Sequence, residues 1–307
     1  MKTTNEKLFE AIRLNQADRV RKLLRPHTSI WSWIIGLITA DIDARDKNGN
    51  TPLMCAVENS SVALCQLLLK YHPDLTLKNR NNQTALSLAV TFNRNRLITP
   101  LIKQGAPLNP KDGSVVPLAQ ALYTQNAPMV KLLLKNGADV TIHDSNHWAM
   151  LIIAVYFQRA DLVKLLLKYK APVNVCDTYY NSQGYRLERT PLILALKNNS
   201  LEIAELLLEA GADINQSANS YSQSPLLMAI QTGSEEALDL LLKYNVDVNI
   251  QGGYTRKNVP LIALYYARMP KDKKKRFFNK LLKAGADSGV LLENGQEIGY
   301  ALRDQLK

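Results

Sequence analysis

The sequence predicts an all-α solenoid in which pairs of short helices stack one after another. A short pattern, most often Pro-Leu followed by aliphatic residues and Ala, returns about every 33 residues. About 15 residues after each copy comes a Leu-rich stretch, usually followed by a turn like Gly137-Ala138-Asp139. A fixed period of this length is the signature of a solenoid. The residues that open the seven copies are Thr51, Thr84, Val116, Ala149, Thr190, Ser224 and Val259.

Each repeat reads as a turn, a short first helix, a polar turn and a longer second helix. The first helix begins at the Pro-Leu, because proline at the first helical position lacks an N–H that would have no partner there. The second helix ends in a Leu-rich stretch whose apolar positions form a broad face for stacking. Glycine then follows where a left-handed C-cap is expected. These glycines are Gly105, Gly137, Gly211 and Gly285.

The repeats predict a single solenoid over residues 1–307, with atypical units at both ends. In order, the segments are an N-terminal capping repeat (1–25), an apolar insertion (26–39), repeats with a second insertion near 179–188 (40–285) and a C-terminal cap (286–307).

The seven in-phase copies resemble the ankyrin repeat. The resemblance implies about eight helix pairs plus a closing C-terminal helix, and it implies that the activity is binding. The family usually has His two residues after the proline, whereas this chain has apolar residues or Ser there, as at Met54 and Ser87. A buried apolar residue replaces a polar network without leaving unsatisfied groups, so we expect the fold to persist with more hydrophobic contact.

The resemblance also implies where a partner protein binds, because ankyrin repeats usually contact partners through turn tips and first-helix ends on their concave face. Aromatic and Arg residues, which dominate interface hot spots, gather at these positions in the middle of the chain. We therefore expect a partner-binding surface formed by Arg80, Phe92, Tyr123, Trp148, Tyr156, Phe157, Arg186, Arg189 and Tyr221.

The two insertions each leave two interpretations open. Residues 26–39, with Trp31 and Trp33, form either a small extra helix on the N-terminal cap or an apolar knob for a partner or membrane. Residues 179–188 form either a finger beside the binding surface or a neutral insertion.

No catalytic set is found, so we expect no enzyme activity, no cofactor and no metal site. The sequence has no Gly-rich phosphate loop, zinc-ligand spacing or nucleophile elbow. His143 and Cys176 occupy equivalent positions in successive repeats, which places them on the order of 10 Å apart, too far for a catalytic hydrogen bond. Three cysteines fit no disulfide framework and favour a reducing, cytoplasmic compartment. No secretory signal or membrane-spanning stretch is expected.

The formal net charge of +11 and the basic run 271–276 suggest an alternative function. In that alternative, the chain is a peripheral protein that binds anionic membranes through residues 30–38 and 271–276. Nucleic acid is a poorer candidate, because no aromatic residues interleave with the basic run. We expect a monomer. The degenerate, Lys- and Asn-rich repeats resemble those of effectors that intracellular bacteria deliver to the host cytosol.

Asn215 and Asn249 suggest a modification. Each follows a Leu-containing stretch and an acidic residue two positions earlier. This context resembles the one in which the eukaryotic asparaginyl hydroxylase modifies ankyrin repeats. The alternative is that both are ordinary turn residues.

Overall fold

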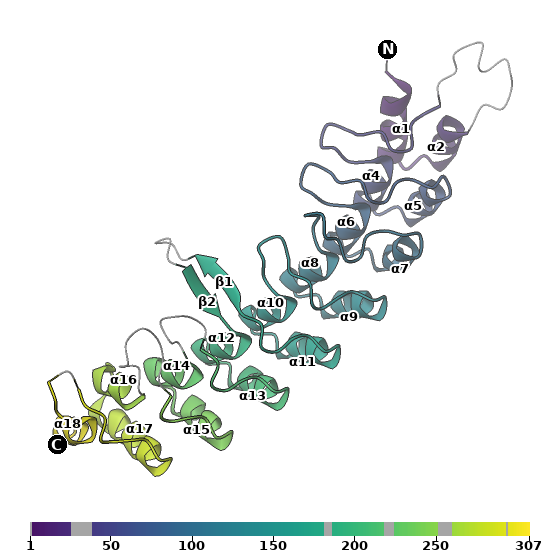
Figure 1. Cartoon of the computed structure of the whole chain (residues 1–307). Coiled ribbons are helices and arrows are strands. Elements are labelled where there is room, and N and C mark those ends of the chain that lie inside the picture. Colours follow the sequence, from purple (N-terminus) through teal and green to yellow (C-terminus); the bar gives the residue numbers. More distant parts are fainter. Residues whose placement is uncertain (1, 26–38, 181–185, 218–223, 251–259, 293) are drawn as a thin grey trace. The chain divides into compact units, whose positions relative to one another are not determined.

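The computed structural model describes residues 2–25, 39–180, 186–217, 224–250, 260–292 and 294–307. It contains two compact units, residues 1–146 and 147–307, and each unit is described by itself. Within each unit, helix pairs stack in sequence order (Figure 1). That the whole chain forms a single solenoid stays a prediction. The apolar insertion, apart from Thr39, lies outside the described residues.

The first unit contains four helix pairs. The first helices of successive pairs pack on one another, and each also packs on its own second helix. The pairs are α1 (Thr4–Arg13) with α2 (Ala17–Leu24), α4 (Pro52–Glu58) with α5 (Val62–Leu69), α6 (Ala85–Thr91) with α7 (Asn95–Lys103), and α8 (Pro117–Tyr123) with α9 (Ala127–Lys135).

The described residues of the second unit form four more pairs and a closing helix, so the all-α repeat fold is confirmed and the described helices make up the predicted eight pairs and closing helix. The pairs are α10 (Met150–Tyr156) with α11 (Ala160–Lys168), α12 (Pro191–Lys197) with α13 (Leu201–Glu209), α14 (Pro225–Thr232) with α15 (Glu235–Lys243), and α16 (Pro260–Tyr266) with α17 (Lys271–Lys283). The closing helix α18 (Ile298–Gln305) packs against α16.

The second insertion adds a β-hairpin to this otherwise helical fold. Strands β1 (Asp177–Tyr180) and β2 (Arg186–Arg189) pair antiparallel, with Asp177 opposite Arg189 at the base. The sequence interpretation left this segment as a finger without secondary structure. Its Thr-Tyr-Tyr run has the residue types that favour strands.

Burial between neighbouring helices stabilises the first helices, and a side-chain N-cap stabilises several of them, though not α8 and α10. Thr51, Thr84, Thr190 and Ser224 each accept a hydrogen bond from the backbone N–H three residues later, at 3.3 Å in every case. Such caps contribute about 1 kcal/mol each. In α4, six of the seven residues are buried, since neighbours cover the helix on several sides.

Asparagine side chains link successive second-helix turns, an arrangement we call the Asn clasp. Asn249 accepts a hydrogen bond from the Asp287 N–H (2.7 Å) and donates one to the Gly285 carbonyl (3.0 Å). Asn109 and Asn174 form the same pair of bonds to the next repeat. Asn215 accepts from the Asp247 N–H at 3.0 Å, and Asp43 accepts from the Asp74 N–H at 3.0 Å.

Candidate partner-binding surface

Exposed large apolar side chains concentrate at the C-terminal ends of the first helices. Among the residues that the structure describes, six large hydrophobic side chains are exposed. Four of them lie at the C-terminal end of a first helix: Leu14 (58% exposed), Phe92 (40%), Tyr156 (48%) and Tyr266 (66%). Apart from α1, the rest of each of these first helices is largely buried, so the helix end is where an apolar side chain reaches solvent. The first-helix ends are therefore the candidate contact surface.

An aromatic cluster lies at the start of the second unit. The rings of Trp148 and Tyr156 meet edge to face with centroids 5.3 Å apart, and Tyr156 meets Phe157 in the same way at 5.3 Å. Trp148 and Phe157 are half-buried, whereas Tyr156 is exposed. Such edge-to-face pairs hold each ring in place at little entropic cost. The three rings therefore form a rigid apolar cluster, and Tyr156 is its exposed member.

Arg189 supports this cluster from within the protein. Its guanidinium carbon lies 3.8 Å from the centroid of the Trp148 ring, and its side chain is buried. The prediction that Arg189 contacts a partner directly is therefore corrected, because a buried side chain positions Trp148 instead. The repeat pattern alone places Arg189 at an exposed turn tip, because the pattern contains no hairpin.

The hairpin base is tied to the start of α10. The carboxylate of Asp177, which is buried, accepts a hydrogen bond from the Ala149 N–H at 2.8 Å. Ala149 occupies the position that Thr holds in other repeats, and it has no side chain that could cap the helix. The hairpin thus compensates for a degenerate repeat residue next to Trp148.

Among the described residues of the first unit, Phe92 is the large aromatic side chain that is exposed. The Arg94 guanidinium lies 5.6 Å from the Phe92 ring centroid. Arg94 also donates hydrogen bonds to the carbonyls of Val57 (3.2 Å) and Glu58 (3.1 Å) at the end of α4. Arg94 therefore holds two successive first-helix ends together and supports Phe92 in its exposed position.

Tyr123 is less available to a partner than the sequence suggests. Its hydroxyl donates a hydrogen bond to the carboxylate of Asp144, which is itself buried. Tyr123 is half-buried, so at least part of the ring belongs to the packing of its own unit.

The nine predicted contact residues are not brought together as one cluster. Arg80, Phe92 and Tyr123 lie in the first unit, and Trp148, Tyr156, Phe157 and Arg189 lie in the second. Arg80 is exposed at a turn tip. Tyr221 lies outside the described residues, and for Arg186 only the backbone of β2 is described.

Leu14 is a first-helix end that the sequence analysis did not predict, because the first helix pair lacks the Pro-Leu pattern that sets the register elsewhere. Tyr266 lies at a predicted helix-end position but outside the nine predicted contact residues. Aligning the helix ends instead of the helix starts identifies Leu14.

Some of the cations in the basic run 271–276 hold helices of this protein together, which the sequence did not predict. Lys274 is buried and donates hydrogen bonds to the Tyr265 carbonyl (3.0 Å) and to Oε1 of Gln305 (3.0 Å), which ties α17 to α16 and α18. Burial lowers the pKa of Lys274. Arg276 forms an ion pair with Glu235 at 2.6 Å. Only part of the run is left to meet an anionic surface.

The described residues contain no trio of His, Cys, Asp or Glu side chains placed to hold a metal ion. Cys55 and Cys65 are buried, and burial raises the pKa of each thiol to about 12. In the same ranges, no helix combines the length and apolar character that crossing a membrane requires.

The chain belongs to the ankyrin repeat family. The model of that family, described as ankyrin repeats, matches residues 8–112, 115–177 and 174–252. Members of this family are protein–protein interaction modules, typically without enzymatic activity.

Individual relatives agree with this assignment. The chain is 27% identical over 176 residues to human transient receptor potential cation channel subfamily A member 1, covering 55% of this chain. It is 39% identical over 49 residues (16% of this chain) to a putative ankyrin repeat protein of Rickettsia bellii (strain RML369-C). The matched regions span 15% and 29% of those two relatives.

A solved structure shows the same fold. The crystal structure of the ankyrin repeat domain of Bcl-3, described as a unique member of the IkappaB protein family, matches with a TM-score of 0.61 at 25% identity. The match covers 77% of this chain and 97% of the Bcl-3 chain.

Proposed function

We propose that this protein is a non-catalytic interaction module that binds a partner protein through its turn tips and first-helix ends, on the concave face expected of ankyrin repeats. The observation that carries the proposal is that, among the described residues, four of the six exposed large hydrophobic side chains lie at the C-terminal end of a first helix, as its last residue or its C-cap. Chance exposure would scatter such residues over the helices. Membership of a family of interaction modules supports the proposal.

Phe92 and Tyr156 are the residues to test, because both are exposed and held by neighbouring groups. Replacing both with Ala should weaken binding of the partner by at least about tenfold, since truncated aromatic hot spots cost more than about 1 kcal/mol each. Helical content should stay unchanged and melting should change little, because both side chains lie at helix ends and are 40% and 48% exposed. The partner is first captured in cells by a photo-cross-linking residue at position 156 and then used in a binding assay.

Leu291 and Tyr300 provide the matched control. They are as exposed as the test residues but lie away from the first-helix ends. Their double Ala variant should bind normally, and a cross-linker at position 300 should capture nothing. Equal binding by the Phe92/Tyr156 variant, or capture of the same protein from position 300, would count against the proposed surface.

The alternative of an anionic-membrane protein has less support. Two cations of the 271–276 run are engaged within the protein, and the 30–38 segment lies outside the described residues.

We also propose Asn215 and Asn249 as hydroxylation sites if the protein acts as an effector in a eukaryotic cytosol. Both side chains take part in Asn clasps, so the enzyme needs the turn to open locally. Asn249 is exposed and Asn215 is half-buried. Mass spectrometry of protein co-expressed with the hydroxylase should show the mass of one added oxygen on these peptides. An unchanged mass on both peptides would refute this proposal.

A further inference from the structure

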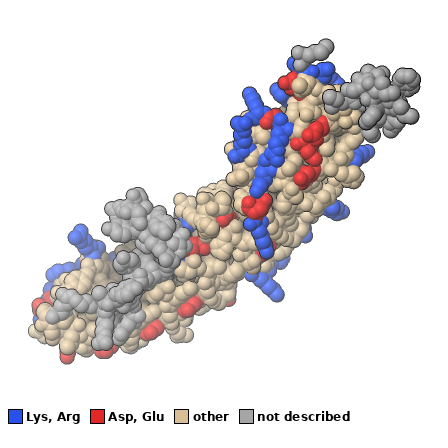
Figure 2. Space-filling view, turned by 45° about the horizontal axis from the view of Figure 1, so that its top comes forward, with Lys and Arg blue, Asp and Glu red and all other residues tan. Residues whose placement is uncertain are grey.

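The turn tips of the first unit carry an excess of positive charge. Residues 44–51, 77–84 and 110–116 contain five cations and two anions, a net charge of 5 − 2 = +3. Figure 2 shows a row of Lys and Arg side chains on the near face of this unit, at the upper right, with Asp and Glu side chains beside it. The cations are Arg45, Lys47, Lys78, Arg80 and Lys111, and the anions are Asp46 and Asp112.

These turns are hydrogen-bonded to one another and so form a fixed platform. The Arg80 N–H donates to the Asn48 carbonyl at 3.1 Å, and the Val115 N–H donates to the Asn82 carbonyl at 3.0 Å. The buried Asn79 side chain donates to the buried Asn50 side chain at 3.0 Å. A surface ordered before binding loses less conformational entropy when a partner docks.

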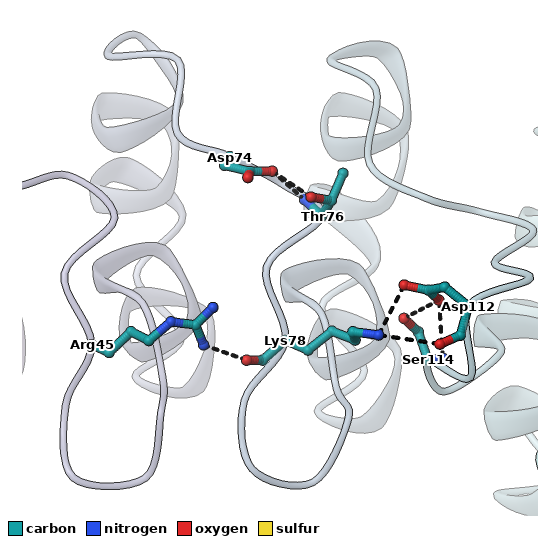
Figure 3. Close-up of polar contacts among 6 residues, drawn as sticks. All are labelled: Arg45, Asp74, Thr76, Lys78, Asp112 and Ser114. Carbon is teal, nitrogen blue, oxygen red and sulfur yellow. Dashed lines mark hydrogen bonds and ion pairs between the residues drawn. The ribbon is translucent and has the colours of Figure 1, made fainter.

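The cations differ in how far the protein itself neutralises them (Figure 3). Lys78 forms an ion pair with Asp112 at 2.9 Å, and hydrogen bonds from Ser114 and Lys78 hold the pKa of Asp112 well below its usual range. Arg45 donates instead to two neutral groups, the carbonyls of Gly49 and Lys78. Lys47 and Arg80 are exposed and, within the described residues, form no ion pair with a carboxylate. Arg45, Lys47 and Arg80 therefore form no ion pair with a carboxylate among the described residues, although Arg45 interacts at longer range with Asp43 and Asp74.

We propose that Arg45, Lys47 and Arg80 bind an acidic, extended segment of the partner protein. This inference rests on the proposed function and names the chemistry of the partner. Arg and Lys side chains form charge-assisted hydrogen bonds with carboxylates. An extended peptide advances about 3.3–3.6 Å per residue, and packed helices lie about 8–10 Å apart, so acidic residues at every third position meet successive turns.

A polypeptide fits this platform better than a single-stranded nucleic acid. Proteins that bind single strands add aromatic side chains on which bases stack. Residues 45–50 and 78–83, which form the first two turn tips, contain no aromatic residue. The platform offers charge without a stacking surface.

The test uses the full chain and a fluorescent peptide in which Glu recurs at every third residue between Gly and Ser. At low ionic strength, Lys47→Gln/Arg80→Gln should weaken binding of this peptide about five- to tenfold, and added salt should abolish the difference. The matched control, Lys70→Gln/Lys131→Gln, removes two exposed lysines from the second-helix side of the same unit. It should bind like the unchanged protein.

Three outcomes would overturn the inference: equal loss in both variants, no binding of the peptide, or tighter binding of single-stranded RNA with the same dependence on Lys47 and Arg80. The cross-linking experiment at position 156 tells failure of this inference apart from failure of the proposed function. Capture that persists without peptide binding refutes only the acidic partner. Absence of capture by the protein that carries the cross-linker at position 156 as its one substitution refutes the proposed function.

Discussion

Replacing Leu302 with Ala should lower the free energy of unfolding of the last repeat by about 2–5 kcal/mol. Leu302 and Ile298 are fully buried, and their helix α18 packs on α16. The start of α18 is also docked closely: a Cβ on Gly299 would lie 2.6 Å from the Cβ of Ser288. Truncating Leu302 leaves a cavity that such a tightly placed helix cannot close by moving. Hydrogen exchange should then show lost protection in α16 and α17.

Tyr300 offers the control on the same helix, because it is 60% exposed. Tyr300→Ala should change stability by no more than about 0.5 kcal/mol, as surface substitutions usually do. The stability of a solenoid is a sum of repeat and nearest-neighbour terms, so protection in α10 and α11 should be unaffected by Leu302→Ala. If the two variants melted alike, α18 would not be a stabilising cap.

The repeat architecture was predictable because the physics that produces it is local. Proline at the first helical position, the hydroxyl caps at Thr51 and Thr190, and the left-handed glycines after the second helices all act within a few residues. Their recurrence at a fixed period then sets the stacking partners. The helix pairs therefore follow from sequence alone.

The contact surface was predictable only in part, because burial depends on how distant segments pack. Phe92 and Tyr156 were found from register and residue type, and both are exposed. Arg189 has the same residue type as a hot spot, but the hairpin buries it against Trp148. The bond between Tyr123 and Asp144 joins residues 21 positions apart and has no signal in the repeat pattern.

The residue at the clasp position depends on the residue that faces it in the next repeat, and the hydrogen bonds in the structure explain why. Asn or Asp at the clasp position is always followed, one repeat later, by an Asp that donates its backbone N–H, as for Asn215 and Asp247. Where the next repeat has proline instead, at Pro107 and Pro172, the clasp position is Thr76 or Thr141. Proline has no N–H to donate, and each Thr hydroxyl bonds the Asp of its own turn. Clasp residues therefore match the donor that the next repeat offers.

Removing two clasps together, with Asn215→Ala/Asn249→Ala, should lower the free energy of unfolding of the second unit by about 2–4 kcal/mol. Three hydrogen bonds between repeats are lost, to the Asp247 N–H, the Asp287 N–H and the Gly285 carbonyl, at about 0.5–1.5 kcal/mol each. Neither Asn has a positive φ, so Ala adds no backbone strain. Urea denaturation measures the total, and hydrogen exchange at Asp247 and Asp287 locates the loss.

Thr76→Ala is the control for this last variant, because Thr76 occupies the clasp position but bonds only Asp74 in its own turn. It should cost less than about 1 kcal/mol, since no bond between repeats is broken. A double Asn variant as stable as Thr76→Ala would mean that the clasps form without holding repeats together. The stacking would then depend on apolar contact alone, and local opening at Asn215 and Asn249 would be no harder than at any exposed turn.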